Sequence, residues 1–127
     1  MEENTTDFIP IAAEFIEALN RGIQNAENNV TRGEAAIEAM LYPAMQLKAQ
    51  GAMFRFPLVT EVSDILVNFL ETVENIDKNV LEIASAHKMT ISVVISNRMT
   101  GDGGAQGQSL KTSLTDACSR YYKSRKN

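Results

Sequence analysis

Residues that could carry out chemistry are few in this chain, and they stand apart from one another. The sequence has one histidine, His87, and one cysteine, Cys118. Neither lies in a local motif that would place an activating base beside a nucleophile. One cysteine can form neither an internal disulfide nor a cysteine-based zinc site. We therefore expect no catalytic nucleophile, no metal ion and no other cofactor.

The carboxylates and glycines offer no stronger signal. Glu71 and Glu74 have the i, i+3 spacing of a metal half-site in a helical bundle, but no Glu-x-x-His motif is present to complete the site. They are better explained as part of a solvated helix face. The glycines of "GDGG", residues 101–104, lack the preceding strand and the following Lys-Ser/Thr of a phosphate-binding loop. That segment is better explained as a turn between two helices.

The composition is that of a single soluble domain spanning residues 1–127. Hydrophobic residues make up 44% of the chain, enough for one core, and the formal net charge of -4 argues against nucleic acid or an anionic membrane as partner. The acidic start, "MEENTTDF", has no signal-peptide pattern, and no stretch approaches the roughly 20 apolar residues of a membrane span. We expect a cytoplasmic protein with frayed ends at residues 1–6 and 124–127.

Apolar residues recur at steps of three and four along almost the whole chain, which is the period of amphipathic helices. Turn signals and prolines divide this pattern into segments. The expected helices run to about residue 30, from Thr31 to about Phe54, from Pro57 to about Val73, from about Ile76 to Met99 and from about Ala105 to Lys123. The short connections between them predict an all-α, up-and-down antiparallel bundle.

Local signals add detail to two of these helices. The second helix is expected to begin with a capping box, in which Thr31 caps the first turn and Glu34 reaches back to the backbone. Pro43, inside the same helix, removes one backbone hydrogen bond and should bend it. His87 falls on the apolar stripe of the fourth helix, so we expect its ring to be buried and structural.

The segment "AMQLKAQGAMFRFPLVTEVSDILVNFLE", Ala44 to Glu71, resembles the histidine-phosphotransfer (HPt) domains of bacterial phosphorelays. It is most similar to the α-proteobacterial subgroup with the signature His-Asp-Leu/Ile-Lys-Gly-Gln-Gly-x-x-Phe-Gly-Tyr-Pro-Leu-Val. The positions that match in register are Leu47, Lys48, Gln50, Gly51, Phe54, Pro57, Leu58 and Val59. The later segment "TGDGGAQGQSLKTSLTDA" is similar to the family's C-terminal turn and helix, so the likeness spans roughly residues 37 to 122. It implies a four-helix bundle with an additional N-terminal helix.

The resemblance implies a phosphotransfer site that this chain has lost. In the family, an exposed histidine on a helix attacks the acyl phosphate of a receiver-domain aspartate, and the receiver supplies the Mg²⁺. Here the acceptor position is Met45, and the glycine that lets the receiver approach is Ala49. Lys48, which offsets phosphoryl charge in the family, is kept, whereas the glycine after the phenylalanine is Arg55. A thioether cannot carry a phosphoryl group, so we expect no enzymatic activity.

The leading hypothesis is a non-catalytic HPt-like signalling protein that binds a response-regulator receiver domain or a histidine kinase. The expected docking face is exposed and consists of Met45, Lys48, Ala49 and Ala52, which share one side of the second helix, with Arg55 near its end. Because this face would carry two cations, its binding to an acidic receiver site is expected to depend on salt.

Two alternatives stay open. The protein could be an active phosphotransfer protein that uses His87, which would require an exposed ring. It could also be a helical bundle used for an unrelated protein–protein contact or for oligomerisation, a role that exposed Met45 and Met53 would suit. The sequence leaves the partner, the pathway and the oligomeric state undetermined.

Overall fold

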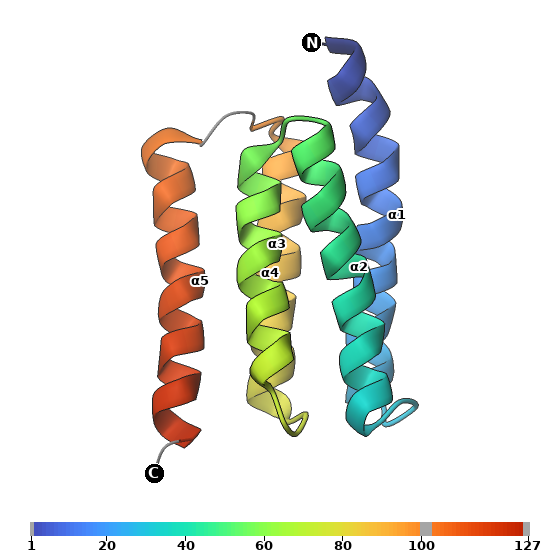
Figure 1. The fold of residues 1–127 in the computed structure, drawn as a ribbon, viewed down its shortest axis with the longest axis vertical. Helices are drawn as coiled ribbons and strands as arrows, with labels where there is room; N and C mark the ends of the chain where they lie inside the picture. The colour runs from blue at the N-terminus through green and yellow to red at the C-terminus, as the bar shows by residue number, and fades with distance from the viewer. Residues whose placement is uncertain (1, 100–102, 126–127) are drawn as a thin grey trace.

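The protein is all-α in the computed structural model, which describes residues 2–99 and 103–125, with side chains described from Phe8 to Ser124. The described residues form helices α1 (Glu2–Glu27), α2 (Gly33–Met53), α3 (Pro57–Thr72), α4 (Lys78–Ser96) and α5 (Gly104–Arg125), and they contain no strand. Successive helices run in alternating directions in Figure 1, with the start of the chain at the top and its end at the bottom. The predicted all-α class is confirmed.

The packing of the helices differs from the prediction in one respect. α1 packs against α2 and α4, and α3 packs against the same two helices, so α1 to α4 close a ring. α5 packs against α3 and α4, outside that ring (Figure 1). The additional helix is therefore the C-terminal one, and the expectation of an additional N-terminal helix is wrong. The physical reason is that α1 has a long apolar stripe, from Phe8 to Ala26, which is buried inside the ring.

The buried side chains of the described residues form two clusters, one above the other along the helices. The upper cluster includes Phe8, Phe56 and Ile91, and the lower cluster includes Leu19, Phe69 and Val80. Two fully buried polar residues, Ser63 on α3 and His87 on α4, lie between the two clusters along their helices. The predicted burial of His87 is confirmed.

Helices α1, α2 and α4 end in the same way. In each, a residue just past the helix adopts a positive φ: Asn29 at 59°, Arg55 at 65° and Arg98 at 50°. The next backbone N–H then bonds back across the last turn, as from Val30 to the carbonyl of Asn25 at 2.8 Å. These are Schellman caps, which usually place glycine at the left-handed position. Two of the three here place an arginine there instead.

The predicted capping box of α2 is wrong. α2 begins at Gly33, and its N-cap residue, Arg32, makes no side-chain hydrogen bond to the helix. The backbone N–H of Thr31 bonds to the carbonyl of Asn25 at 3.2 Å, so Thr31 belongs to the end of α1. Its hydroxyl oxygen is buried without a hydrogen-bond partner among the described residues.

The start of α4 is capped by a residue that the sequence analysis did not single out. Asp77 Oδ1 accepts a hydrogen bond from the backbone N–H of Val80 at 2.9 Å. This N-cap places the first helical residue at Lys78, and the left-handed Arg98 ends the helix at Ser96. The fourth helix is therefore shorter at both ends than predicted.

The two end helices of the described chain run from Glu2, in α1, and to Arg125, in α5. Met1, Lys126 and Asn127 lie outside the described residues, as do residues 100–102 of the predicted turn. Within the described part of the chain, no helix combines the length and the apolar character needed to cross a membrane.

Candidate functional site

The residues predicted to form a docking face lie on the outer side of α2. Met45 is 49% exposed, and Ala49 and Ala52 are also exposed. On the opposite side of the same helix, Leu47 and Gly51 are buried in the molecule. The helical period therefore places the predicted face in solvent, and the expected exposure of Met45 is confirmed.

The exposed apolar surface of α2 is longer than predicted. Tyr42 is 62% exposed and Met53 is 67% exposed. Together with Met45 and Ala49 they follow steps of three, four and four, so they form one stripe along the helix. We define the α2 face as Tyr42, Met45, Ala49, Ala52 and Met53. Tyr42 was not predicted to be part of this face, although its position three residues before Met45 places it on the same side of the helix.

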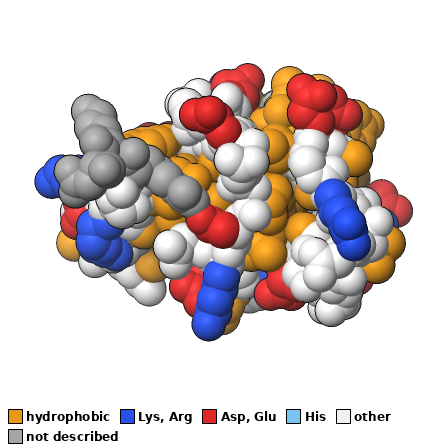
Figure 2. Space-filling view, turned by 90° about the horizontal axis from the view of Figure 1, so that it is seen from below, with side chains coloured by type: hydrophobic (Ala, Val, Ile, Leu, Met, Phe, Trp, Pro, Cys, Tyr) orange, Lys and Arg blue, Asp and Glu red, His pale blue; other side chains and the backbone are white. Residues whose placement is uncertain are grey.

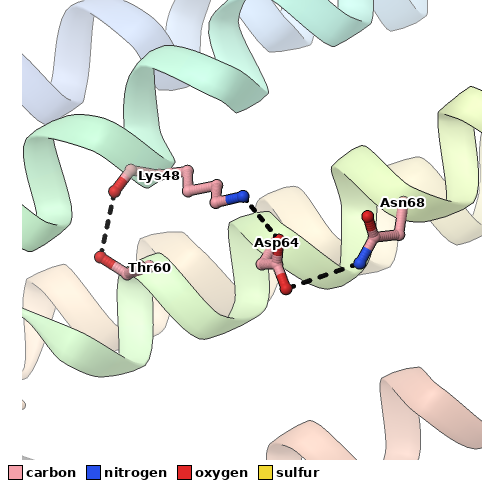
Figure 3. Close-up of polar contacts among 4 residues, drawn as sticks. All are labelled: Lys48, Thr60, Asp64 and Asn68. Atoms are coloured by element: carbon pink, nitrogen blue, oxygen red, sulfur yellow. Dashed lines mark hydrogen bonds and ion pairs between the residues drawn. The ribbon is translucent and has the colours of Figure 1, made fainter.

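Lys48, at the edge of the α2 face, is not a free cation. Its Nζ lies 2.8 Å from Oδ1 of Asp64 on α3, and both side chains are a little under half exposed (Figure 3). Asn68 Nδ2 donates to Oδ2 of the same carboxylate at 3.5 Å. The positive charge expected at this edge is therefore balanced by a carboxylate that the sequence analysis did not identify.

A second contact holds the backbone of Lys48 against α3. Thr60 Oγ1 donates a hydrogen bond to the carbonyl oxygen of Lys48 at 3.1 Å (Figure 3). The helices come this close because residue 51 is a glycine. A Cβ at Gly51 would lie 2.7 Å from Thr60 Oγ1 and 3.2 Å from Val59 Cγ1, closer than ordinary contacts allow. Gly51 thus sets the α2–α3 spacing that brings Lys48 to Asp64.

Arg55 stands at the corner between α2 and α3. Its backbone is left-handed, and the cap is closed by hydrogen bonds from the N–H of Phe56 to Gly51 O at 2.8 Å and from its own N–H to Ala52 O at 3.4 Å. Phe56 is fully buried and packs on Phe8, with ring centroids 4.6 Å apart. The side chain of Arg55 is exposed and forms no ion pair within the described part of the chain.

His87 has the surroundings of a structural residue. Its ring is fully buried, and Nδ1 lies 2.7 Å from the carbonyl oxygen of Ile83, one turn earlier in α4. Nε2 has no hydrogen-bond partner among the described residues. Burial lowers the pKa of His87 below 6.5, and the hydrogen bond to Ile83 opposes that shift only in part. A neutral, enclosed ring cannot meet a receiver's acyl phosphate, which counts against His87 as a phosphoacceptor.

Cys118 is also unsuited to chemistry. The side chain is buried in the lower cluster, and burial raises the pKa of its thiol to about 11. Because the thiolate is the reactive form, this thiol is unreactive near neutral pH.

A cavity of about 490 Å³ lies at the other end of the molecule, far along the bundle from Met45. It is formed by the α1–α2 and α3–α4 connections, at the lower end of the molecule in Figure 1. Figure 2 shows this end from below. Its lining mixes the charges of Arg32, Lys78 and Glu82 with apolar side chains such as Leu81. No single ligand chemistry follows from this mixture, so the α2 face remains the stronger candidate site.

Comparison of the chain with protein-family models, with curated proteins and with solved structures finds no match. The case for function therefore rests on the α2 face and on the HPt-like signature that runs through it.

Proposed function

We propose that this protein is a non-catalytic HPt-like protein of bacterial two-component signalling, which binds a receiver domain or a histidine kinase without carrying phosphate. The observation that carries the proposal is the position of Met45. This residue occupies the acceptor position of the HPt-like signature and lies exposed in the middle of an apolar helix face. We further propose that the helices form an up-and-down bundle and that the protein acts in the cytoplasm.

The α2 face has the properties of a surface that another helix could cover. Ala49 and Ala52 are small, so a partner backbone can come close to the middle of the face. Met45 and Met53 have flexible, polarisable side chains that adapt to a partner surface. Tyr42 offers an aromatic anchor at one end, and aromatic anchors dominate many interfaces.

Burial of this apolar surface, rather than charge, would supply most of the binding energy. Each Å² of apolar surface removed from water contributes about 25 cal/mol. Lys48 adds little net charge because Asp64 neutralises it at 2.8 Å. Arg55 is the remaining cation near the face. The salt dependence expected from two cations should therefore be weak.

The same apolar stripe also suits the second candidate function, a contact with an unrelated protein or with another copy of this chain. Exposed apolar patches of this kind mark interaction sites in general. The HPt-like signature favours a receiver or kinase partner, because Lys48 and Gly51 on α2 and Phe54 at its C-cap occupy matching positions.

The proposal is tested by incubating the purified protein with receiver domains in their unphosphorylated and phosphorylated forms, following binding in both samples and phosphoryl transfer in the second. We expect binding without any acid-labile label on the protein. Met45→Asp and Ala49→Arg should each abolish the binding while leaving the helical content and the thermal unfolding midpoint unchanged, because both positions are exposed.

Matched controls come from the exposed side of α4. Met89 is 61% exposed and Ala86 is exposed, so Met89→Asp and Ala86→Arg make the same chemical changes on a different helix. These controls should bind like the wild type. Transfer of label to the wild type would refute the non-catalytic part of the proposal. Self-association that Met45→Asp abolishes, without binding to receivers, would favour the second candidate.

A further inference from the structure

Under the proposed function a receiver would present its aspartate at Met45, and the Lys48–Asp64 ion pair lies one turn further along α2. Lys48 follows Met45 by three residues, so the two side chains leave α2 on the same side. Asp64 reaches this place from α3, with its Oδ1 2.8 Å from Lys48 Nζ and with 44% of its side chain exposed. The side of α2 that carries Lys48 thus has a carboxylate as well as a cation (Figure 3).

A phosphorylated aspartate would find no compensation for its charge in this region. The thioether of Met45 has no hydrogen to donate and is at most a weak acceptor. The Lys48 ammonium already pairs with Asp64, whose carboxylate would lie close to the incoming phosphoryl oxygens. A charged group that is buried without a partner is strongly destabilising, and a like charge beside it adds to the penalty.

The other nearby cation is too far along the helix to take over. Arg55 follows Met45 by ten residues, which corresponds to about 15 Å along a helix axis. Its backbone is fixed in the left-handed cap of α2, so its side chain starts from the far end of the α2 face. Asp64 therefore neutralises the cation that lies one turn from Met45.

We infer that the α2 face binds receivers selectively in the unphosphorylated state and releases them on phosphorylation, with Asp64 as the specificity-determining residue. This inference rests on the proposed function, because it concerns the state of the same partner. An unphosphorylated receiver brings less negative charge to Met45, so the apolar contact forms at a lower electrostatic penalty. The protein would then keep an unphosphorylated receiver bound until a kinase or an active phosphotransfer protein phosphorylates that receiver.

The test measures affinity by calorimetry for a panel of purified receiver domains in Mg²⁺, each with and without beryllofluoride. Beryllofluoride adds to the receiver aspartate and mimics the phosphoryl group. We expect the affinity of the wild type for the unmodified form to be at least about tenfold higher than for the beryllofluoride form. The reason is that the added negative charge of the beryllofluoride form would face the Asp64 carboxylate across the interface. Asp64→Asn frees Lys48 and should reduce this ratio to about threefold or less.

Two further variants make the result specific to the ion pair. Lys48→Met leaves the Asp64 carboxylate unbalanced, so it should raise the ratio above that of the wild type. Glu61→Gln removes another α3 carboxylate, one that pairs with Lys111 of α5 at 3.1 Å, and should leave the ratio unchanged.

The outcomes separate the two proposals. The inference is overturned if both receiver forms bind with equal affinity or if the beryllofluoride form binds more tightly. It is also overturned if neither Asp64→Asn nor Lys48→Met changes the affinity ratio. In each of these cases the proposed function stands. If no receiver binds in either form, the proposed function fails and the inference fails with it.

Discussion

Burial gives His87 a property that can be measured without any partner. The folded ring has a lowered pKa, whereas in the unfolded chain the pKa returns to about 6.5. Below that value the unfolded chain binds a proton that the folded ring does not, so unfolding is favoured as the pH falls. We expect the free energy of unfolding to decrease from pH 7 toward about pH 5.5, with a slope of up to about 1.4 kcal/mol per pH unit.

Urea denaturation of wild type and His87→Ala at several pH values checks this prediction. His87 is the only histidine, so the variant should lose the slope in this pH range. At pH 7 it should also be less stable than the wild type by about 1–3 kcal/mol, the usual loss for a packed, hydrogen-bonded group. Identical pH profiles for the two proteins would mean that the ring is exposed in solution.

Arg55 lends itself to a second residue-scale prediction, because it has a left-handed φ of 65° without being a glycine. Arg55→Gly should raise the free energy of unfolding by up to about 1 kcal/mol, since glycine has no Cβ to oppose this backbone conformation. Arg98→Gly, at the same cap position of α4, should do likewise. Arg21→Gly in the middle of α1 should instead lower it by about 1 kcal/mol. Thermal unfolding of the three variants checks this prediction. If backbone strain is the cause, the two cap variants are more stable than the wild type and Arg21→Gly is less stable.

At the scale of the elements, the pairing of α2 with α3 depends on Gly51. A Cβ there would lie 2.7 Å from Thr60 Oγ1, so Gly51→Ala should push the helices apart and destabilise the protein by about 1–3 kcal/mol. The same shift should weaken the Lys48–Asp64 pair and the hydrogen bond from Thr60.

A double-mutant cycle with Thr60→Ala tests this account of the α2–α3 spacing. Removing the nearest clashing atom should recover part of the loss, so the double variant should be more stable than the sum of the single effects predicts. Strict additivity of the two substitutions would show that residue 51 and residue 60 do not meet.

α1 and α2 meet through a similar device. Pro43 has no N–H to offer the carbonyl of Ala39, one turn earlier, and that oxygen faces Gly22 of α1, where a Cβ would lie 2.8 Å away. Pro43 in the sequence predicts the lost hydrogen bond. The packing of a glycine from another helix against the freed carbonyl depends on the tertiary structure and has no signal in the sequence.

At the scale of the whole molecule, periodicity in the sequence was enough to predict the all-α class and the outward side of α2. Apolar steps of three and four place Leu47 inside and Met45 outside whatever the helix packs against. The burial of His87 followed from the same pattern.

What the sequence could not predict depends on how the elements pack together. The Lys48–Asp64 pair requires the register between two antiparallel helices, and no single helix contains that information. The place of α5 outside the ring was missed because one apolar stripe does not say which neighbours will cover it. The capping box at Thr31 fails because this residue belongs to the end of α1: its backbone N–H bonds to the carbonyl of Asn25. It is therefore not available to cap α2.

Net charge yields a prediction at this same scale. The chain carries a formal charge of -4, and the cation at the edge of the α2 face is neutralised by Asp64. Affinity for a receiver should therefore fall by less than about threefold between low and physiological salt, where screening lengths are roughly 10 Å or shorter. Asp64→Asn, which frees the lysine, should make the salt dependence steeper. A wild-type affinity that already falls steeply would show that charge, rather than apolar burial, drives the contact.

The most direct test of the central claim is a map of the contact on the protein itself. Isotope-labelled protein is titrated with a receiver domain that it binds, and the backbone amide shifts are followed by NMR. The account predicts that the largest changes fall on the α2 face, around Tyr42, Met45 and Ala49, and that they vanish in Met45→Asp but persist in Met89→Asp. Changes confined to the opposite end of the molecule, around Arg32 and Lys78, would contradict it.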